Sequence, residues 1–265
     1  SCIVEIETDD GIVGWGECYG PSAVARAYID TQFGPRILGR DPFDVEVIWE
    51  DLYNRIKDYG GEGMAASALS GIDIALWDIV GKACGKPVHK LIGGAHRTEV
   101  QCYATGLYFI DMNRLVEEAV EEAREYVSQG FTAIKMKIGL GDPKLDVRRV
   151  AAVREAVGAD VRLMVDANHC FTVPQAIRLG REFEALDIEW FEEPISPEDI
   201  DGYVEVTRAL DMAVAGAENG FTRWGFRDLI VRKAMDIVQP DVCAAGGLWV
   251  GGWSTRKVVH PAIHR

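Results

Sequence analysis

The chain has 265 residues, of which 48% are hydrophobic and 26% are charged, and its formal net charge is −14 at pH 7. This composition excludes a disordered chain, and the length is enough for one large or two modest globular domains. The negative charge argues against nucleic-acid binding, which needs a basic surface. No apolar run approaches the ~20 residues of a membrane-spanning helix, so no membrane partner is predicted.

The N-terminus and the cysteines indicate the compartment. The first residues lack the basic segment and apolar stretch of a signal peptide. The cysteines are scattered and form no C-x-x-C pair, so we expect reduced thiols in a cytoplasmic protein, without disulfides or a cysteine-based zinc site. The six cysteines are Cys2, Cys18, Cys84, Cys102, Cys170 and Cys243.

The first part of the chain has the pattern of a β-hairpin followed by helices. Apolar and polar residues alternate over residues 4–7, residues 8–11 are turn-forming, and residues 12–15 return, which predicts a hairpin over residues 4–15. A helix is predicted over residues 64–84, because apolar residues recur every three or four positions and Gly85 follows. We therefore predict an α+β domain over residues 1–95.

Short apolar strands alternate with amphipathic helices from Thr98 onward. Such alternation predicts a parallel sheet in an α/β fold, and consecutive units of roughly 22–30 residues favour a (β/α) barrel of the TIM type. A complete barrel has eight strands, of which six are recognisable. We assign the barrel to residues 96–265, incomplete or divergent after about residue 247. The predicted strands are Val100–Ala104, Ala133–Ile138, Val161–Asp166, Ile188–Glu192, Ala213–Glu218 and Ile237–Gln239.

Acidic residues recur at the ends of successive predicted strands. Asp166, Glu192 and Glu218 are each separated by 26 residues, about one strand–helix unit, and Asp241 follows 23 residues later. In a parallel barrel these strand ends lie side by side, so the first three carboxylates are expected to converge. Such a group repels itself unless a cation is bound, and an all-oxygen ligand set suits Mg²⁺. The alternative is that each acid is a helix cap or a solvated loop residue.

Two lysines lie one unit upstream of the first acid. Lys135 and Lys137 alternate with apolar residues, so both are expected on one face of the strand over residues 133–138. Two ammonium groups held together in a barrel interior depress each other's pKa, which would make one of them a usable general base. The alternative is a strand with a solvated basic face.

These motifs closely resemble those of the enolase superfamily, in its mandelate racemase-like subgroup, over nearly the whole chain up to about Gly247. The resemblance implies an α+β capping domain followed by a TIM-type barrel. The motifs are the hairpin TDDGIVGWGE at residues 8–17, the helix GIDIALWDIVGK at residues 71–82, LIGG at residues 91–94, the lysine pair, VDAN at residues 165–168, EEP at residues 192–194, Glu218-Asn219 and QPD at residues 239–241.

The resemblance also implies a mechanism. Asp166, Glu192 and Glu218 would bind Mg²⁺, which would hold the substrate carboxylate and stabilise the enediolate formed when the α-proton leaves. Lys137 would be the base, and Lys135 would lower the pKa of Lys137 and help to neutralise the substrate carboxylate. Asp241 would orient a catalytic histidine on the opposite face of the substrate.

The expected substrate is a small carboxylate, and within this subgroup dehydration of an acid sugar is favoured over racemisation or epimerisation of a 2-hydroxy acid. Five polar residues are candidates to bind it, with Asn168 also close to the metal and His169 a possible acid. A packed or solvated His169 and a surface ion pair for Arg223 are the alternatives. The substrate-binding candidates are Tyr19, Asn168, His169, Asn219 and Arg223.

The sequence departs from the family pattern near its C-terminus. The opposite-face histidine is expected roughly 25–30 residues beyond Asp241, whereas His260 and His264 lie 19 and 23 residues beyond it. We therefore expect a chain truncated at both ends or read out of frame after Gly247, which would expose strand edges and favour a homo-oligomer. A metal-binding chain without turnover is the second hypothesis. A phosphate-binding barrel is disfavoured, because no glycine-rich phosphate loop opens a helix.

Overall fold

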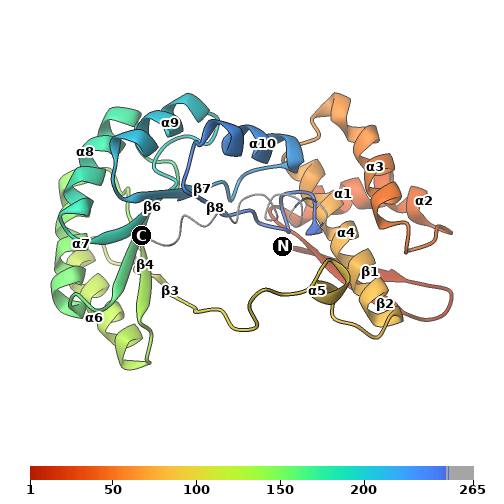
Figure 1. Cartoon of the computed structure of the whole chain (residues 1–265), viewed down its shortest axis with the longest axis horizontal. Coiled ribbons are helices and arrows are strands. Elements are labelled where there is room, and N and C mark those ends of the chain that lie inside the picture. The colour runs from red at the N-terminus through yellow and green to blue at the C-terminus, as the bar shows by residue number, and fades with distance from the viewer. Residues whose placement is uncertain (249, 251–265) are drawn as a thin grey trace. The chain divides into compact units, whose positions relative to one another are not determined.

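The computed structural model describes residues 1–248 and residue 250, and it forms two compact units (Figure 1). Each unit is assembled from segments that are separated in the sequence. The first unit comprises Ser1–Thr98, Glu218–Asp228 and the described residues from Pro240 onward, and the second comprises Glu99–Ala217 and Leu229–Gln239.

The first unit consists of a β-hairpin packed on helices. Strands β1 (Cys2–Glu7) and β2 (Val13–Cys18) are antiparallel, with Cys2 opposite Cys18 and Glu7 opposite Val13. The hairpin packs on helix α4 (Met64–Ala83). Both elements confirm the sequence prediction. The remaining elements are α1 (Ser22–Tyr28), the π-helix η1 (Ile29–Phe33), α2 (Gly34–Ile37), α3 (Val45–Ile56), the 3₁₀ helix η2 (Lys57–Tyr59) and α5 (Val88–Leu91).

Helix α4 forms the core of this unit. It is long and apolar enough to cross a membrane by length and composition alone, but 78% of its most apolar window is buried inside the structure. The backbone of β2 lies directly on it, since a Cβ placed on Gly14 would be 2.2 Å from the Ala75 carbonyl oxygen and one on Gly16 would be 1.9 Å from that of Gly71. Only glycine fits at these two positions of β2.

This close approach makes Gly16 a position of large expected effect on stability. We expect Gly16→Ala to lower the free energy of unfolding by about 1–3 kcal/mol or more, because the added methyl group meets helix backbone that cannot move aside. Gly225→Ala is the matched control, since nothing lies within 4 Å of a Cβ there. Urea unfolding measures both. Equal effects of the two substitutions would contradict the proposed packing.

The second unit is built around a six-stranded parallel sheet in the order β3-β4-β5-β6-β7-β8 (Figure 1). All six predicted strands are present, but the first begins at Ala104, four residues later than predicted. Val100 is 81% exposed there, whereas Ala104 is buried and pairs with Ile134. The strands are β3 (Ala104–Gly106), β4 (Ala133–Lys137), β5 (Arg162–Asp166), β6 (Ile188–Glu192), β7 (Ala213–Gly216) and β8 (Ile237–Val238).

Amphipathic helices connect these strands, as the alternating pattern predicts. Their apolar faces are buried while their charged faces are exposed; for example, Ala176, Leu179 and Phe183 are all buried on one helix. The helices are α6 (Leu115–Ser128), α7 (Pro143–Val157), α8 (Val173–Glu184), α9 (Ile200–Ala209) and α10 (Thr222–Arg232), of which the last begins in the first unit.

One face of the sheet carries a small apolar layer and, further along the strands, charged residues. The apolar layer is formed by Ala133, Met164, Trp190 and Ala215, which pack together. Side chains alternate along a strand, so residues two positions further on share this face. The next residues on it are therefore Lys135 and Lys137 on β4, Asp166 on β5 and Glu192 on β6. The fold thus brings the predicted lysines and two of the predicted acids to one end of one sheet face.

Candidate active site

Strand register places the two lysines and two acids side by side. Lys137 is the pairing partner of Asp166 across β4 and β5, and Asp166 is the partner of Glu192 across β5 and β6. Lys137, Asp166 and Glu192 are the last residues of their strands, and Lys135 lies two residues before Lys137 on the same face. In a (β/α) barrel the carboxyl end of the strands carries the active site. The sequence prediction that both lysines lie on one face is confirmed, because both ammonium groups contact Asp166.

The lysines and acids form a buried charge cluster. Lys137 Nζ lies 2.5 Å from Asp166 Oδ2, and Lys135 Nζ lies 3.5 Å from the same oxygen. Lys135 also donates a hydrogen bond to Glu192 Oε1. Asp166 is fully buried, Glu192 is 2% exposed and Lys135 is 7% exposed. Two ammonium groups and two carboxylates therefore neutralise one another away from water.

The charges shift the pKa of Lys135 in a direction opposite to that predicted. Burial lowers the pKa of Lys135, but its hydrogen bond to Glu192 and the charges of Glu192 and Asp166 outweigh burial and raise it. The prediction of a depressed pKa considered only the neighbouring lysine, and it is wrong for Lys135 in this structure. Burial likewise raises the pKa of Asp166, but hydrogen bonds from Lys137 and the Asn168 N–H, with the charge of Lys135, lower it below its usual value.

The lowered pKa of Asp166 predicts acid sensitivity. A carboxyl with a lower pKa in the folded state stabilises the fold above its unfolded pKa of about 4, and this contribution is lost as the pH falls through the folded value. In EDTA, we expect the unfolding free energies of wild type and Asp166→Asn to differ most near pH 7 and to converge below pH ~4. Urea unfolding across this range measures the difference. A difference that does not change with pH would contradict the assignment.

Glu192 is held by two further donors that the sequence reasoning missed. Trp190 Nε1 donates to Glu192 Oε2 at 2.9 Å, and Gln239 Nε2 donates to the same oxygen at 3.0 Å. Trp190 belongs to the apolar layer of the sheet, but its indole N–H also orients the acid. Strand alternation provides a signal for this contact, because residues 190 and 192 share a face. The contact from Gln239 arises only in the folded sheet.

Polar residues after β5 and β6 extend the cluster. Asn168 Oδ1 accepts a hydrogen bond from Lys137 Nζ at 2.7 Å, and Asn168 Nδ2 donates to Glu193 Oε2 at 3.3 Å. His169 Nε2 lies 3.1 Å from the same Glu193 oxygen. Asn168, His169 and Glu193 all have positive φ angles, of 41°, 69° and 43°. Such left-handed residues concentrate at functional sites. Glu193, which is 1% exposed, was missed as a site residue.

Two tyrosine rings face the ammonium groups. Lys135 Nζ lies 5.7 Å from the centre of the Tyr103 ring, and Lys137 Nζ lies 5.9 Å from that of Tyr108. Tyr108 is 53% exposed and Tyr103 is half-buried. Both precede α6 in chain segments whose sequence gives no sign of a function, so sequence reasoning did not find them.

Five predicted site residues belong to the first unit, and their grouping with the lysine and acid cluster remains a prediction. Asp241 Oδ1 accepts from the Cys243 N–H at 2.7 Å. Arg223 is ion-paired with Glu50 and stacked on Trp224, 4.6 Å from the ring centre. His260 and His264 lie outside the described residues. The five residues are Tyr19, Glu218, Asn219, Arg223 and Asp241.

The second unit supplies some, but not all, of the oxygen ligands that a hard cation such as Mg²⁺ needs. Asp166 and Glu192 supply buried carboxylate oxygens from neighbouring strand ends, which is the ligand type that Mg²⁺ prefers. Two lysines already balance these two charges, so a divalent ion needs a third acid. Among the described residues, no group of three or more His, Cys, Asp or Glu side chains is gathered closely enough to hold a metal.

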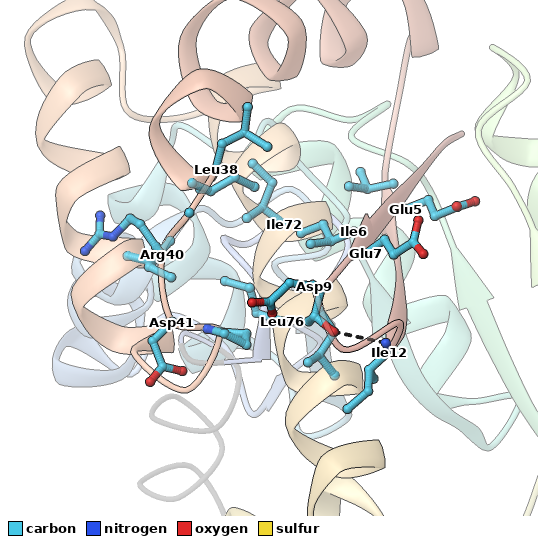
Figure 2. A pocket seen from close by; sticks show the side chains of 18 of the residues that line it. Glu5, Ile6, Glu7, Asp9, Ile12, Leu38, Arg40, Asp41, Ile72 and Leu76 are labelled. Carbon is cyan, nitrogen blue, oxygen red and sulfur yellow. Dashed lines mark hydrogen bonds between the residues drawn. The ribbon is translucent and has the colours of Figure 1, made fainter.

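A cavity of about 950 Å³ lies in the first unit (Figure 2). It is lined by apolar side chains that include Ile6, Ile72 and Leu76, and Glu5 and Arg40 are among its charged lining residues. It contains none of the predicted site residues. The cavity therefore does not mark the position of the proposed chemistry.

Two family models match the chain. The N-terminal domain model of mandelate racemase and muconate lactonizing enzyme matches residues 1–93, and the enolase C-terminal domain-like model matches residues 118–257. The chain belongs to the enolase superfamily. Its similarity to mandelate racemase, predicted from motifs in both the capping and the barrel segments, is confirmed.

Curated relatives of this enolase-superfamily chain are named as enzymes of acid sugars or their lactones. It is 46% identical over 245 residues to D-galactarolactone cycloisomerase from Agrobacterium fabrum. It is 41% identical over 246 residues to arabinonate dehydratase from Saccharolobus solfataricus. These alignments cover 92% of this chain but only 64% and 65% of the two relatives. The chain thus spans just under two thirds of their length.

Solved structures match the same fold. The 3,6-anhydro-D-galactonate cycloisomerase from Zobellia galactanivorans has a TM-score of 0.89 at 46% identity, covering 97% of this chain and 70% of that one. A racemase from Streptomyces coelicolor with bound magnesium has a TM-score of 0.89 at 36% identity, covering 96% and 76%. The predicted combination of a capping domain and a TIM-type barrel is confirmed by these enolase-superfamily neighbours.

Proposed function

We propose that the chain removes the proton α to the carboxylate of an acid sugar, as the first step of a dehydration. The observation that carries this proposal is the buried cluster of Lys135, Lys137, Asp166 and Glu192 at the carboxyl ends of β4 to β6. The names of the relatives support the substrate class, since they include dehydratases of arabinonate and of L-talarate and galactarate.

Lys137 is the proposed base. Its ammonium group is the less buried of the two and is held between Asp166 and Asn168, so its position is defined before a substrate arrives. Once deprotonated, the Lys137 amine takes the α-proton of a substrate bound above it. Lys135, held against Glu192, keeps its positive charge close to the substrate carboxylate and to the negative charge that develops there.

Mg²⁺ is the proposed cofactor. Asp166 and Glu192 would hold it together with Glu218. The Glu218 carboxylate would supply the further negative charge that a divalent ion needs, because Lys135 and Lys137 already balance Asp166 and Glu192. When bound, the ion supplies positive charge beside the substrate carboxylate. Trp190 and Gln239 keep Glu192 oriented for this purpose through their hydrogen bonds to Oε2.

Polar residues near the base would bind the hydroxyl groups of the substrate. Asn168 and His169 are the candidates in the second unit, with Tyr19, Asn219 and Arg223 from the first. In a dehydration, an acid must protonate the β-hydroxyl group as it leaves. His169 is one candidate, and a histidine oriented by Asp241 is the other.

Racemisation or epimerisation of a 2-hydroxy acid is the second candidate function. It needs the same first step, because the α-proton must leave before it returns to the other face. The observation that favours it is the likeness to the magnesium-containing racemase structure. A metal-binding chain without turnover is the third candidate.

The proposal is tested by a screen of aldonic and aldaric acids with Mg²⁺, with and without EDTA. A dehydratase forms a 2-keto-3-deoxy acid, which reacts with semicarbazide to give an ultraviolet-absorbing product, whereas an epimerase changes only the stereochemistry of the substrate. We expect the keto product, and we expect EDTA to abolish it. Turnover that is insensitive to EDTA would overturn the metal-dependent mechanism.

Three further properties are proposed with the function. We expect a homo-oligomer, and we expect it in the cytoplasm, in keeping with six free cysteines. We also retain the boundary near residue 95 as the division between capping and barrel domains. Size-exclusion chromatography with light scattering tests the oligomer, and a monomer would contradict it.

A further inference from the structure

Arg149 is a fully buried cation on helix α7 that the mechanism above does not use. Its guanidinium group makes three hydrogen bonds, all to backbone carbonyl oxygens. Nη1 donates to Lys137 at 2.8 Å, Nη2 donates to Leu107 at 2.8 Å and Nε donates to Leu115 at 3.2 Å. A buried charge is costly unless it is fully hydrogen-bonded, so this arrangement holds three chain segments at fixed positions.

The first of these segments is the end of strand β4, which carries the proposed base. Arg149 holds the carbonyl group of Lys137 itself. Asp146, one turn earlier on α7, accepts a hydrogen bond from the Gly139 N–H at 3.1 Å. Helix α7 therefore holds the main chain on both sides of residue 138 by hydrogen bonds to Lys137 and Gly139.

The second segment is the loop between β3 and α6. Leu107, whose carbonyl group Arg149 binds, has a φ of 55°, which is uncommon for a residue other than glycine. The ring of Phe109 lies 4.6 Å from the guanidinium carbon. Tyr108, between these two residues, is 53% exposed, and the centre of its ring lies 5.9 Å from Lys137 Nζ. Arg149 thus contacts the residues on both sides of Tyr108, through a hydrogen bond to Leu107 and a cation–π contact with Phe109.

We propose that Arg149 is a positioning residue, which fixes the main chain of Lys137 and the Leu107 turn and so sets where the Lys137 ammonium group and the Tyr108 ring lie. The catalytic part of this inference rests on the proposed function. The positioning part rests on the hydrogen bonds alone. A misplacement of about 1 Å at a reacting group lowers a rate by ~100-fold, so this role predicts a large kinetic effect from a residue that touches no substrate.

Arg154 provides a matched control on the same helix. Its guanidinium group also donates only to backbone carbonyl oxygens, and none of them belongs to a site residue. The acceptors are Gly158, Val161, Leu186 and Asp187, at 2.6–2.9 Å. Loss of either arginine removes a multidentate backbone contact, but only Arg149 is joined to the base and to the Tyr108 loop.

The experiment compares Arg149→Met, Arg149→Lys and Arg154→Met. Turnover of the acid sugar found in the screen gives kcat and KM per folded molecule, with the folded fraction taken from circular dichroism. Amide hydrogen exchange by mass spectrometry reports on residues 104–115. For Arg149→Met we expect kcat to fall ~100-fold with little change in KM, and faster exchange over the loop. Arg149→Lys should recover part of the rate, because an ammonium group reaches some of the carbonyls. Arg154→Met should lose stability but retain kcat and loop protection.

Equal loss of kcat per folded molecule in Arg149→Met and Arg154→Met would overturn the proposal, as would unchanged exchange over residues 104–115. If Arg149→Met does not fold, Arg149→Lys decides between the outcomes by the same two measurements. A wild-type protein without turnover would contradict the proposed function, and loop exchange would then decide by itself whether Arg149 holds the turn.

Discussion

Replacing Lys137 with alanine is expected to lower the rate of α-proton removal by ~10²–10⁴-fold, the range that a positioned general base contributes. The substitution also removes an ion-pair partner of the fully buried Asp166, so the rates are compared per folded molecule, with the folded fraction taken from circular dichroism. Binding of the substrate should change far less than kcat, since the proton is transferred only in the chemical step. Initial rates with the acid sugar found in the screen measure both parameters.

Lys144→Ala is the control for this substitution. Lys144 lies in the first turn of α7, its residue is exposed, and its main-chain N–H donates to Asp142. We expect this variant to have wild-type kcat. A Lys137→Ala variant that turns over as fast as Lys144→Ala would exclude Lys137 as the base.

Loss of either buried carboxylate is expected to weaken Mg²⁺ binding strongly. Changes in the residues that merely orient metal ligands cost 10–100-fold in affinity, so we expect Asp166→Asn and Glu192→Gln each to weaken binding by at least ~100-fold. Each substitution also removes the partner of a buried ammonium group, which destabilises a protein by about 3–5 kcal/mol. Isothermal titration calorimetry with Mg²⁺ and urea unfolding in EDTA separate the two effects.

Glu189→Gln is the matched control for Glu192→Gln. Both residues are on β6, but Glu189 is exposed and ion-paired with Arg162 at 3.1 Å, away from the lysines. We expect Glu189→Gln to bind Mg²⁺ as the wild type does and to lose little stability, because surface ion pairs contribute about 0–1 kcal/mol. Binding that survives in both Asp166→Asn and Glu192→Gln would place the metal elsewhere.

Much of the fold could be predicted because its elements have regular periods. Apolar alternation predicted the β1–β2 hairpin, the spacing of apolar residues predicted α4, and the repeat of strand and helix predicted the parallel sheet. Strand β3 was misplaced because only three of its residues pair, and its position is set by its neighbour β4 rather than by its own composition. Short strands of this kind carry too little pattern to be located from sequence.

Those site residues could be predicted whose positions follow from the pattern of a single strand. Lys135 and Lys137 share a face because they are two residues apart, and Asp166 and Glu192 each end a buried strand. The contacts of Gln239, Tyr108 and Arg149 could not be predicted, since each joins segments that meet only after folding. The raised pKa of Lys135 has the same origin, because it depends on Glu192 two strands away.

The central claim is that this chain holds a base over the α-carbon of a carboxylate, and proton exchange tests it most directly. Exchange needs only the base and the bound substrate, not the acid that would expel a hydroxyl group. Proton NMR in D₂O follows the α-proton signal of the acid sugar with Mg²⁺. We predict that wild type replaces this proton with deuterium and that Lys137→Ala does not. Exchange at the same rate in both proteins, or product formation by wild type with the α-proton retained, would contradict the account.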